Sequence, residues 1–181
     1  MTPQHASGNA MPNIVLVGFM GTGKTTVGKV LARRLNMTFV DMDDTIVARA
    51  GKPVTRIFAE DGEPAFRAME RALVRELSLR QGLVIGAGGG VVLNPENVAD
   101  FERTGIVVCL SLAPEVILQR LADDTTRPLL AGDDKEQELR EKLSARQPLY
   151  DAVKLQVDRT GLDVDQTVDR ILALCRAAEE G

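Results

Sequence analysis

The stretch GFMGTGKT, residues 18–25, decides the fold of this chain because it fits the pattern G-x-x-x-x-G-K-[ST] in the right setting. The run NIVLV at 13–17 predicts a buried strand before it, and the residues at 24–35 predict a helix after it. Glycines at such a turn let backbone N–H groups point at phosphate oxygens, and the helix N-terminus adds partial positive charge. The stretch therefore predicts an α/β domain that binds a nucleotide, in preference to a glycine-rich turn that binds nothing.

Each residue type in this loop suits a task that ATP binding requires. The expected ATP-binding residues of the loop and of the helix start are Gly21, Thr22, Gly23, Lys24, Thr25 and Thr26. Lys24 can reach the β- and γ-phosphates, where we expect it to act in catalysis, and the Thr25 hydroxyl supplies a ligand for Mg²⁺. The loop predicts a nucleoside triphosphate with Mg²⁺, but by itself it does not specify a reaction.

The rest of the chain alternates between short strand patterns and longer helical ones. Strands are expected at 38–40, 82–86, 105–110 and 153–157. Helices are expected at 44–50, 54–60, 64–80, 114–122, 135–147 and 164–178. This alternation predicts a parallel sheet with helices on both faces. We expect a disordered tail over 1–12, one domain over 13–178, and a mobile lid at about 122–135, where Asp, Thr and Gly are frequent.

The composition limits the possible partners. A chain of 181 residues with 44% hydrophobic residues can bury a sizeable core in one domain. Its net charge of -4 gives no general attraction to nucleic acid or to anionic membranes, so neither is expected as a partner. No apolar run approaches the roughly 20 residues of a membrane span, and the polar start lacks a signal peptide's apolar stretch. We expect a cytoplasmic monomer in which Cys109 and Cys175, which lack CxxC spacing, are free buried thiols.

Three carboxylates follow the second expected strand, in FVDMDD at 39–44. The only histidine, His5, lies in the expected tail, so a general base in the domain must be a carboxylate. Side chains two apart on a strand point to one face, so we expect Asp41 and Asp43 to share a side, at the sheet edge where ligands collect, while Met42 points away. We expect Asp41 to support the Mg²⁺ shell and Asp43 to orient an acceptor hydroxyl and take its proton. Asp44 suits a helix cap or a first-turn acid, and a solvated acidic turn remains the alternative for the pair.

Three classes of protein compete for such a loop: small-molecule kinases, GTPase switches and mechanical ATPases. A GTPase should show D-x-x-G some tens of residues after the loop, and N-K-x-D for guanine. D-x-x-G occurs only at 158–161, and N-K-x-D is absent. Mechanical ATPases are usually larger, and the sequence has no partner-binding repeat and no ABC-type signature. A kinase of a small acceptor fits best.

A glycine run and three arginines are candidates for the acceptor site. GAGGG at 86–90 directly follows a strand pattern, and glycines there allow the backbone to approach a ligand closely. Arg67, Arg127 and Arg146 each have a distinct local setting, and a guanidinium can bind a carboxylate or a transferring phosphoryl group. Taken singly, each arginine is better explained as a surface ion pair. Their occurrence together with the phosphate-binding loop makes them candidates.

These residues together resemble the shikimate kinase family. The matching motifs are GFMGTGKTT, the D-x-D at 41–43, IFAEDGEPAFRAME at 57–70, GAGGGVV at 86–92, TRPLLAG at 126–132 and RQPLY at 146–150. The resemblance spans about 13–175. It implies a P-loop NTPase of the nucleoside-monophosphate-kinase type: three α/β/α layers, a five-stranded parallel sheet in order 2-3-1-4-5, and a mobile lid. It also implies transfer of the ATP γ-phosphoryl group to the 3-hydroxyl of shikimate, with Mg²⁺, in the route to chorismate and the aromatic amino acids.

The resemblance implies roles for matching residues on the nucleotide side. Lys24 would bind the phosphates, and Thr25 with Asp41 would hold Mg²⁺ and its waters. Arg127 would close with the lid over the phosphates and act in catalysis, and Arg120 would pack against adenine. The loop at 157–162 should form the other side of the adenine site, but it lacks the proline expected there.

On the acceptor side, the resemblance assigns a complete pocket. Asp43 would bind the substrate hydroxyls and take the proton, and Arg67 with Arg146 would clamp the carboxylate of shikimate. The pocket wall would come from Gly88, Gly89 and Gly90, and its apolar side from Phe58 and Phe66. For the two phenylalanines, plain core packing is an equal alternative.

Two other functions remain open at this stage. Gluconate kinase also phosphorylates a carboxylated polyol, which would suit the same arginines and aspartates. A nucleotide-binding regulatory module with a degenerate acceptor site is the non-enzymatic alternative, and the presence of Asp43, Arg67 and Arg146 argues against it.

Overall fold

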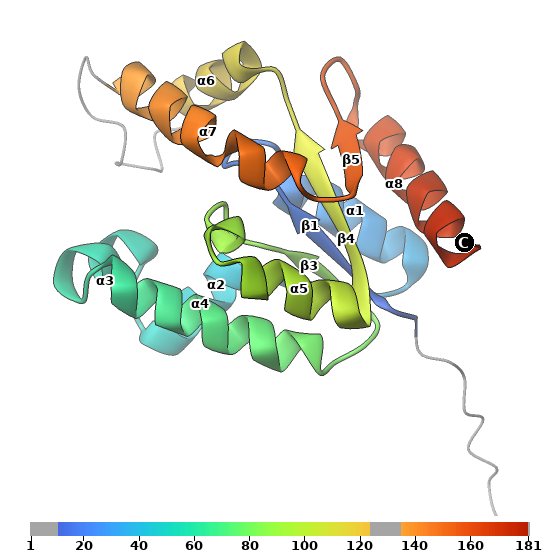
Figure 1. Cartoon of the computed structure of the whole chain (residues 1–181), viewed down its shortest axis with the longest axis horizontal. Helices are drawn as coiled ribbons and strands as arrows, with labels where there is room; N and C mark the ends of the chain where they lie inside the picture. The colour runs from blue at the N-terminus through green and yellow to red at the C-terminus, as the bar shows by residue number, and fades with distance from the viewer. Residues whose placement is uncertain (1–10, 124–134, 181) are drawn as a thin grey trace, which may run out of the picture.

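The computed structural model describes residues 11–123 and 135–180, and within them five strands form one parallel sheet (Figure 1). The strands are β1 (Asn13–Val17), β2 (Thr38–Asp41), β3 (Leu83–Gly86), β4 (Gly105–Ser111) and β5 (Leu155–Asp158). Their order is β2-β3-β1-β4-β5, as expected, with β1 at the centre. Val15 of β1 is paired with Ile85 on one side and Val107 on the other. Because all strands are parallel, the segments that follow β1, β2 and β3 meet at one edge of the sheet.

Helices cover both faces of this sheet. They are α1 (Lys24–Leu35), α2 (Met42–Ala50), α3 (Val54–Glu60), α4 (Glu63–Ser78), α5 (Pro95–Thr104), α6 (Pro114–Asp123), α7 (Lys135–Asp151) and α8 (Val164–Glu179), with a 3₁₀ turn η1 (Val91–Leu93). Alternate residues of β1 serve two cores. Ile14 and Leu16 pack with α1 and α8, whereas Val15 and Val17 pack with α4, α5 and α7. Figure 1 shows α1 and α8 on one side of the sheet and α4 and α5 on the other.

Several elements begin or end differently from the sequence expectation. Helix α5 was not expected, although its start carries ordinary signals: Asn94 caps the helix by accepting a hydrogen bond from the Glu96 backbone, and Pro95 opens it. Helix α7 continues through Pro148 to Asp151, beyond the expected end at 147. Strand β5 begins later than expected, at Leu155. The differences in α7 and β5 lie at element ends, and none of the three differences changes the order of the strands in the sheet.

Asn13 ties β1 to the segment that enters β3. Its amide nitrogen donates to the carbonyls of Leu77 and Arg80 at 3.1 and 2.8 Å, and its amide oxygen accepts from the Leu83 backbone at 3.0 Å. Asn13 is 1% exposed, so these bonds replace water that the backbone groups cannot reach. One polar side chain thus joins the end of α4, β1 and the start of β3.

Two further expectations can be compared with the structure. None of the described helices has the length and apolar character to cross a membrane. Cys109 and Cys175 are both buried and free, as expected. Burial raises the pKa of each thiol to about 11, which makes both poor nucleophiles near neutral pH. The described part of the chain begins two residues inside the expected tail, where the Met11 carbonyl accepts a hydrogen bond from the Gly82 backbone at 2.8 Å.

Candidate active site

The phosphate loop, residues 18–25, joins β1 to α1 and keeps the N-terminus of α1 open. Gly21 and Gly23 have φ angles of 81° and 88°, in the left-handed region that favours glycine. Gly23 is the N-cap of α1 and, as a glycine, supplies no side-chain cap to this helix end. Unsatisfied N–H groups at a helix N-terminus favour an anion. The loop has the backbone geometry that phosphate binding requires.

Lys24 lies over this loop. Its Nζ donates to the carbonyls of Gly18 and Phe19 at 2.7 and 3.0 Å, so the ammonium is part-buried at the loop. The Thr22 hydroxyl also donates to the Phe19 carbonyl, at 2.8 Å, and holds the loop in its turn. The positive charge of Lys24 is therefore already placed beside the open helix end. Its contact with ATP phosphates stays a prediction.

Thr25 and Asp41 form the candidate magnesium site. The Thr25 hydroxyl donates to Oδ2 of Asp41 at 2.8 Å, which joins the first turn of α1 to the end of β2. Within residues 11–123 and 135–180, no group of three or more His, Cys, Asp or Glu side chains is placed to hold a metal. Mg²⁺ commonly binds through one or two protein oxygens together with substrate phosphates and water. One hydroxyl and one carboxylate beside the phosphate loop fit that requirement.

The expectation that Asp41 and Asp43 lie on one face of a strand is wrong. Strand β2 ends at Asp41 and α2 begins at the next residue, because Oδ1 of Asp41 accepts a hydrogen bond from the Asp44 backbone at 3.2 Å and caps the helix. Asp43 and Asp44 are therefore first-turn acids of α2, and the cap is Asp41, not Asp44. A helix start, and not strand alternation, sets the directions of these side chains.

Asp43 faces the glycine segment after β3. A Cβ added to Gly88 would lie 2.8 Å from Oδ1 of Asp43 and 3.2 Å from Oε2 of Glu70, so both carboxyl groups approach the Gly88 backbone. A side chain at Gly88 would thus displace them. Asp41 therefore contacts Thr25 of the phosphate loop, whereas Asp43 lies beside Gly88. The two carboxylates are thus placed differently, as their separate expected roles require.

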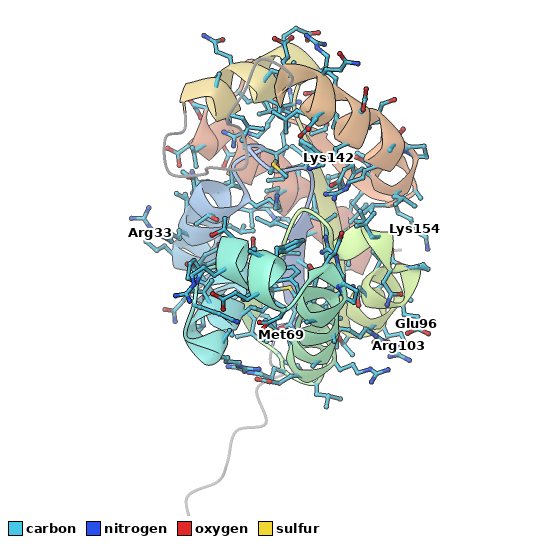
Figure 2. The ribbon with its side chains drawn as sticks, turned by 90° about the vertical axis from the view of Figure 1, so that its left-hand side faces the viewer. Arg33, Met69, Glu96, Arg103, Lys142 and Lys154 are labelled. Carbon is cyan, nitrogen blue, oxygen red and sulfur yellow. The ribbon has the colours of Figure 1, made fainter. Side chains whose placement is uncertain are left out.

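Glu70 is a site residue that the sequence reasoning missed. It lies on α4, is 1% exposed, and its Oε1 accepts from Nη1 of Arg67 at 3.0 Å. Oε2 has no hydrogen-bond partner among the described residues. Burial raises the pKa of Glu70, Arg67 opposes that effect, and Asp43 adds to it. The preceding residue, Met69, lies at the surface (Figure 2), whereas Glu70 is turned inward.

Arg67, which we expect to bind a substrate carboxylate, is held in place by its neighbours on α4 and after β3. Besides Glu70, it pairs with Glu63 at 3.2 Å on the preceding turn of α4. A Cβ on Gly90 would lie 2.4 Å from Nη1 and Nη2 of Arg67, so the guanidinium packs on the backbone at Gly90. A side chain at this position would displace the guanidinium. The guanidinium is only partly exposed and is oriented by two carboxylates.

Tyr150 connects α7 to the glycine wall. Its hydroxyl donates to the Gly89 carbonyl at 2.5 Å, and the residue is 3% exposed. Burial raises the pKa of Tyr150 to about 12, while the nearby Arg146 guanidinium opposes this rise. Arg146 also acts on the pKa of Glu70, opposing its rise. Arg146 from α7 therefore lies close to the same pocket as Arg67 from α4.

Phe58 and Phe66 pack against each other beside the Arg67 guanidinium. Their ring centroids are 4.9 Å apart with an interplanar angle of 40°. Phe66 is buried and Phe58 is half-buried, and the Arg67 guanidinium lies 5.3 Å from the Phe66 ring centroid. Core packing accounts for Phe66, but its ring also supports Arg67. Contact of either ring with a substrate stays a prediction.

On the nucleotide side the structure describes one of the two expected arginines. Arg120, near the end of α6, donates to the Gly21 carbonyl at 3.3 Å and is exposed. Its guanidinium is thus placed beside the phosphate loop, as the adenine role would need. Arg127, and the expected lid from 124 to 134, lie outside the described residues.

Comparison with known proteins agrees with this geometry. A model of the shikimate kinase family matches residues 20–176. The chain belongs to the shikimate kinase family. Among its relatives, the shikimate kinase of Desulforudis audaxviator is 48% identical over 162 residues, which cover 90% of this chain and 85% of that protein. The shikimate kinase of Pelotomaculum thermopropionicum is 45% identical over 162 residues, covering 90% of this chain and 94% of that protein.

Solved structures place this shikimate kinase family member in the same fold. A shikimate kinase from Acinetobacter baumannii in complex with shikimate superposes with a TM-score of 0.86 at 38% identity, covering 93% of this chain and 94% of that one. A gluconokinase from Sinorhizobium meliloti reaches a TM-score of 0.61 at 21% identity, covering 93% and 94%. The second likeness shows the fold alone.

Two of the missed residues carried a signal in the sequence. Glu70 follows Arg67 by three residues on a helix, a spacing that places the two side chains on one face. Tyr150 is the only tyrosine of the chain and ends the RQPLY motif. Neither position reveals its partner, because burial of Glu70 and the bond from Tyr150 to Gly89 depend on how α4 and α7 pack.

Proposed function

We propose that this protein transfers the γ-phosphoryl group of ATP to the 3-hydroxyl of shikimate, giving shikimate 3-phosphate and ADP in the route to the aromatic amino acids. The observation that supports the proposal is the group of charged side chains around the glycine segment after β3. There Asp43, Arg67 and Glu70 converge on Gly88 and Gly90. An acid that can take a proton and guanidiniums that can bind a carboxylate match an acceptor with both a hydroxyl and a carboxylate.

The transfer assigns a task to each group. The acceptor hydroxyl loses its proton to Asp43 as its oxygen bonds to the γ-phosphorus, and the bond from that phosphorus to the bridging oxygen of ADP breaks. Arg67 and Arg146 hold the carboxylate, so that the hydroxyl stays in line with the phosphoryl group. Lys24 and the N–H groups of the loop stabilise the charge on the phosphate oxygens.

Mg²⁺ would be held by the Thr25 hydroxyl and the Asp41 carboxylate, whose oxygens are 2.8 Å apart. When bound, it would supply positive charge that neutralises the charge on the phosphate oxygens. Asp41 also caps α2, so the same carboxylate fixes the helix that carries Asp43. This arrangement couples the nucleotide side to the acceptor side. Closure by Arg127 over the phosphates remains part of the proposal.

A coupled ADP-release assay tests the function directly. Purified protein with MgATP is given shikimate, quinate, gluconate or nucleoside monophosphates in separate reactions. We expect shikimate to give the highest kcat/KM by a wide margin. ADP release no greater than background on adding shikimate would reject the proposal, and a preference for gluconate would replace it with the gluconate kinase alternative. ATP binding without turnover of any acceptor would favour the regulatory module. Size-exclusion chromatography of the purified protein tests the expectation of a monomer. Fractionation of cells that contain the protein tests the expectation of a cytoplasmic location.

A further inference from the structure

The loop after β5 places Arg159 against the phosphate loop. The Arg159 backbone donates to the Ser111 carbonyl at 3.0 Å, which fixes the loop to the end of β4. Its Nη1 donates to the Thr22 carbonyl at 2.8 Å, and the residue is only 4% exposed. A Cβ on Gly23 would lie 2.0 Å from Nη1, so the guanidinium occupies the space beside the N-cap of α1. Arg159 has no role in the reaction proposed above.

The charge of Arg159 has no carboxylate partner in the part of the chain that the structure describes. Its Nε is buried without a hydrogen-bond acceptor there, and the preceding Asp158 carboxylate accepts from the Thr160 backbone at 2.9 Å instead. The charged group that acts on the pKa of Arg159 is Arg120, which lowers it in the same direction as burial does. Two guanidiniums therefore flank the phosphate loop, one at the Gly21 carbonyl and one at the Thr22 carbonyl.

A buried cation without a counter-charge is costly in a folded protein. Removing an ion from water is strongly unfavourable unless an opposite charge or hydrogen bonds replace the lost hydration. An arginine cannot avoid this cost by releasing its proton, because its pKa stays far above neutral pH. A bond to one carbonyl could be made by a neutral donor at lower cost. The position is therefore explained better by an anion that binds beside it.

We propose that Arg159 is a nucleotide-binding residue whose counter-charge is the phosphate chain of a bound nucleoside di- or triphosphate. The guanidinium adjoins the helix end and the loop whose N–H groups favour phosphate. This inference rests on the proposed function only in requiring a nucleotide at the phosphate loop. It does not depend on the identity of the acceptor.

The experiment measures MgADP binding by calorimetry and thermal unfolding without ligand. It compares the unaltered protein with Arg159→Met, which keeps the apolar stem, and Arg159→Lys, which keeps the charge. Arg176→Met on the exposed side of α8 is the matched control. We expect Arg159→Met to raise the Kd for MgADP at least about tenfold, Arg159→Lys to stay within about threefold, and the control to show no change. Because the buried charge is removed, we expect the ligand-free melting temperature of Arg159→Met to equal or exceed that of the unaltered protein.

The outcomes separate the charge role from a structural one. A smaller rise in Kd for Arg159→Met, or equal losses in the Met and Lys variants, would overturn the proposal. A lower melting temperature, or loss of cooperative unfolding, in ligand-free Arg159→Met would identify the side chain as a brace for the Thr22 carbonyl and would also overturn it. Shikimate is absent from these measurements. If the unaltered protein binds MgADP but does not phosphorylate shikimate, the proposed function fails while the result for Arg159 can still be read.

Discussion

At the scale of single residues, the proposed acceptor site is organised by the buried carboxyl of Glu70, which lies near two guanidiniums. Glu70 pairs with Arg67 at 3.0 Å and feels the charge of Arg146, while its second oxygen lies near Asp43 and Gly88. The pair fixes the Arg67 fork on α4 before any substrate arrives. An acceptor carboxylate then meets a guanidinium that has already lost its rotamer freedom, which reduces the entropic cost of binding.

Arg67→Lys tests the carboxylate clamp. An ammonium has no planar fork and cannot bind Glu70 and a substrate carboxylate in the same way, so we expect the KM for shikimate to rise by roughly tenfold. The kcat should fall much less, because Arg67 does not touch the reacting oxygen. Steady-state kinetics at saturating MgATP give both constants. Arg75→Lys, two turns further along α4 and exposed, is the control. An unchanged KM would remove Arg67 from the acceptor site.

Asp41→Asn and Asp43→Asn test the division between metal and acceptor. An amide at Asp43 cannot take the hydroxyl proton, so we expect kcat to fall by about 10²–10⁴ while MgADP still binds. An amide at Asp41 weakens the candidate metal site, so we expect a higher Mg²⁺ concentration to be needed for half-maximal rate. Titrating Mg²⁺ in the kinase assay and measuring MgADP binding separates these effects. If both substitutions gave the same profile, the two roles would not be distinct.

Glu70→Gln tests the electrostatics of the pocket through pH. Burial raises the pKa of Glu70 in the folded protein above its unfolded value of about 4.3, so the folded state holds this proton more tightly. Stability from this group is therefore full below about pH 4.3 and is lost as the pH rises through the folded pKa. Gln cannot titrate. We expect the free energy of unfolding of Glu70→Gln minus that of the unaltered protein to increase from pH 4 to pH 7, measured by urea denaturation. A flat or falling difference would contradict a raised pKa.

At the scale of elements, the alternation of patterns predicted the parallel sheet and most helices, because the period of apolar residues reports which face is buried. The strand order came from the resemblance to the family and agrees with the structure. The start of α2 was misjudged because Asp41 serves both strand and cap, and only the hydrogen bond to Asp44 shows which residue is the last of the strand. Helix α5 was missed because the cap signal at Asn94 follows closely on the glycine run. The candidate residues of the loop were predicted from one motif.

Contacts between elements could not be predicted in the same way. The bond from Tyr150 to Gly89 joins residues 61 positions apart, and the contact of Arg159 with Thr22 joins residues 137 positions apart. Such pairs carry no period and no local spacing. They follow from the order β2-β3-β1-β4-β5, which brings the loops after β1, β3 and β5 to one edge of the sheet.

Asn13→Ala tests a junction between elements. The substitution leaves the Leu83 N–H buried without its partner and removes the donor that the Leu77 and Arg80 carbonyls share, and we expect a loss of about 2–4 kcal/mol in the free energy of unfolding. Urea denaturation measures it. Gln81→Ala, exposed in the segment that enters β3, is the control and should change stability by less than about 0.5 kcal/mol. A loss as small as that of the control would show that water satisfies these backbone groups.

At the scale of the whole molecule, the proposed acceptor site is formed by side chains from elements that are distant along the chain. Asp43 comes from α2, Arg67 and Glu70 from α4, and Arg146 from α7, with the glycine wall after β3 between them. A substrate that binds all of them binds only the fully folded domain. The prediction of a single domain over 13–178 thus has a thermodynamic consequence: shikimate must stabilise the molecule as one unit.

Calorimetric unfolding tests this consequence. We expect one cooperative transition, which shikimate at a hundredfold its Kd shifts upward as a whole by about 2.7 kcal/mol, or roughly 5–10 °C for a domain of this size. In Arg146→Met the shift at the same shikimate concentration should be much smaller, because the pocket loses the guanidinium that α7 supplies. Arg140→Met, on the exposed side of α7 where it pairs with Glu136, should keep the full shift. If the ligand moved only one of two transitions, the chain would unfold in separate parts and the pocket would not depend on their joint folding. An equal shift in Arg146→Met would instead place α7 outside the acceptor site.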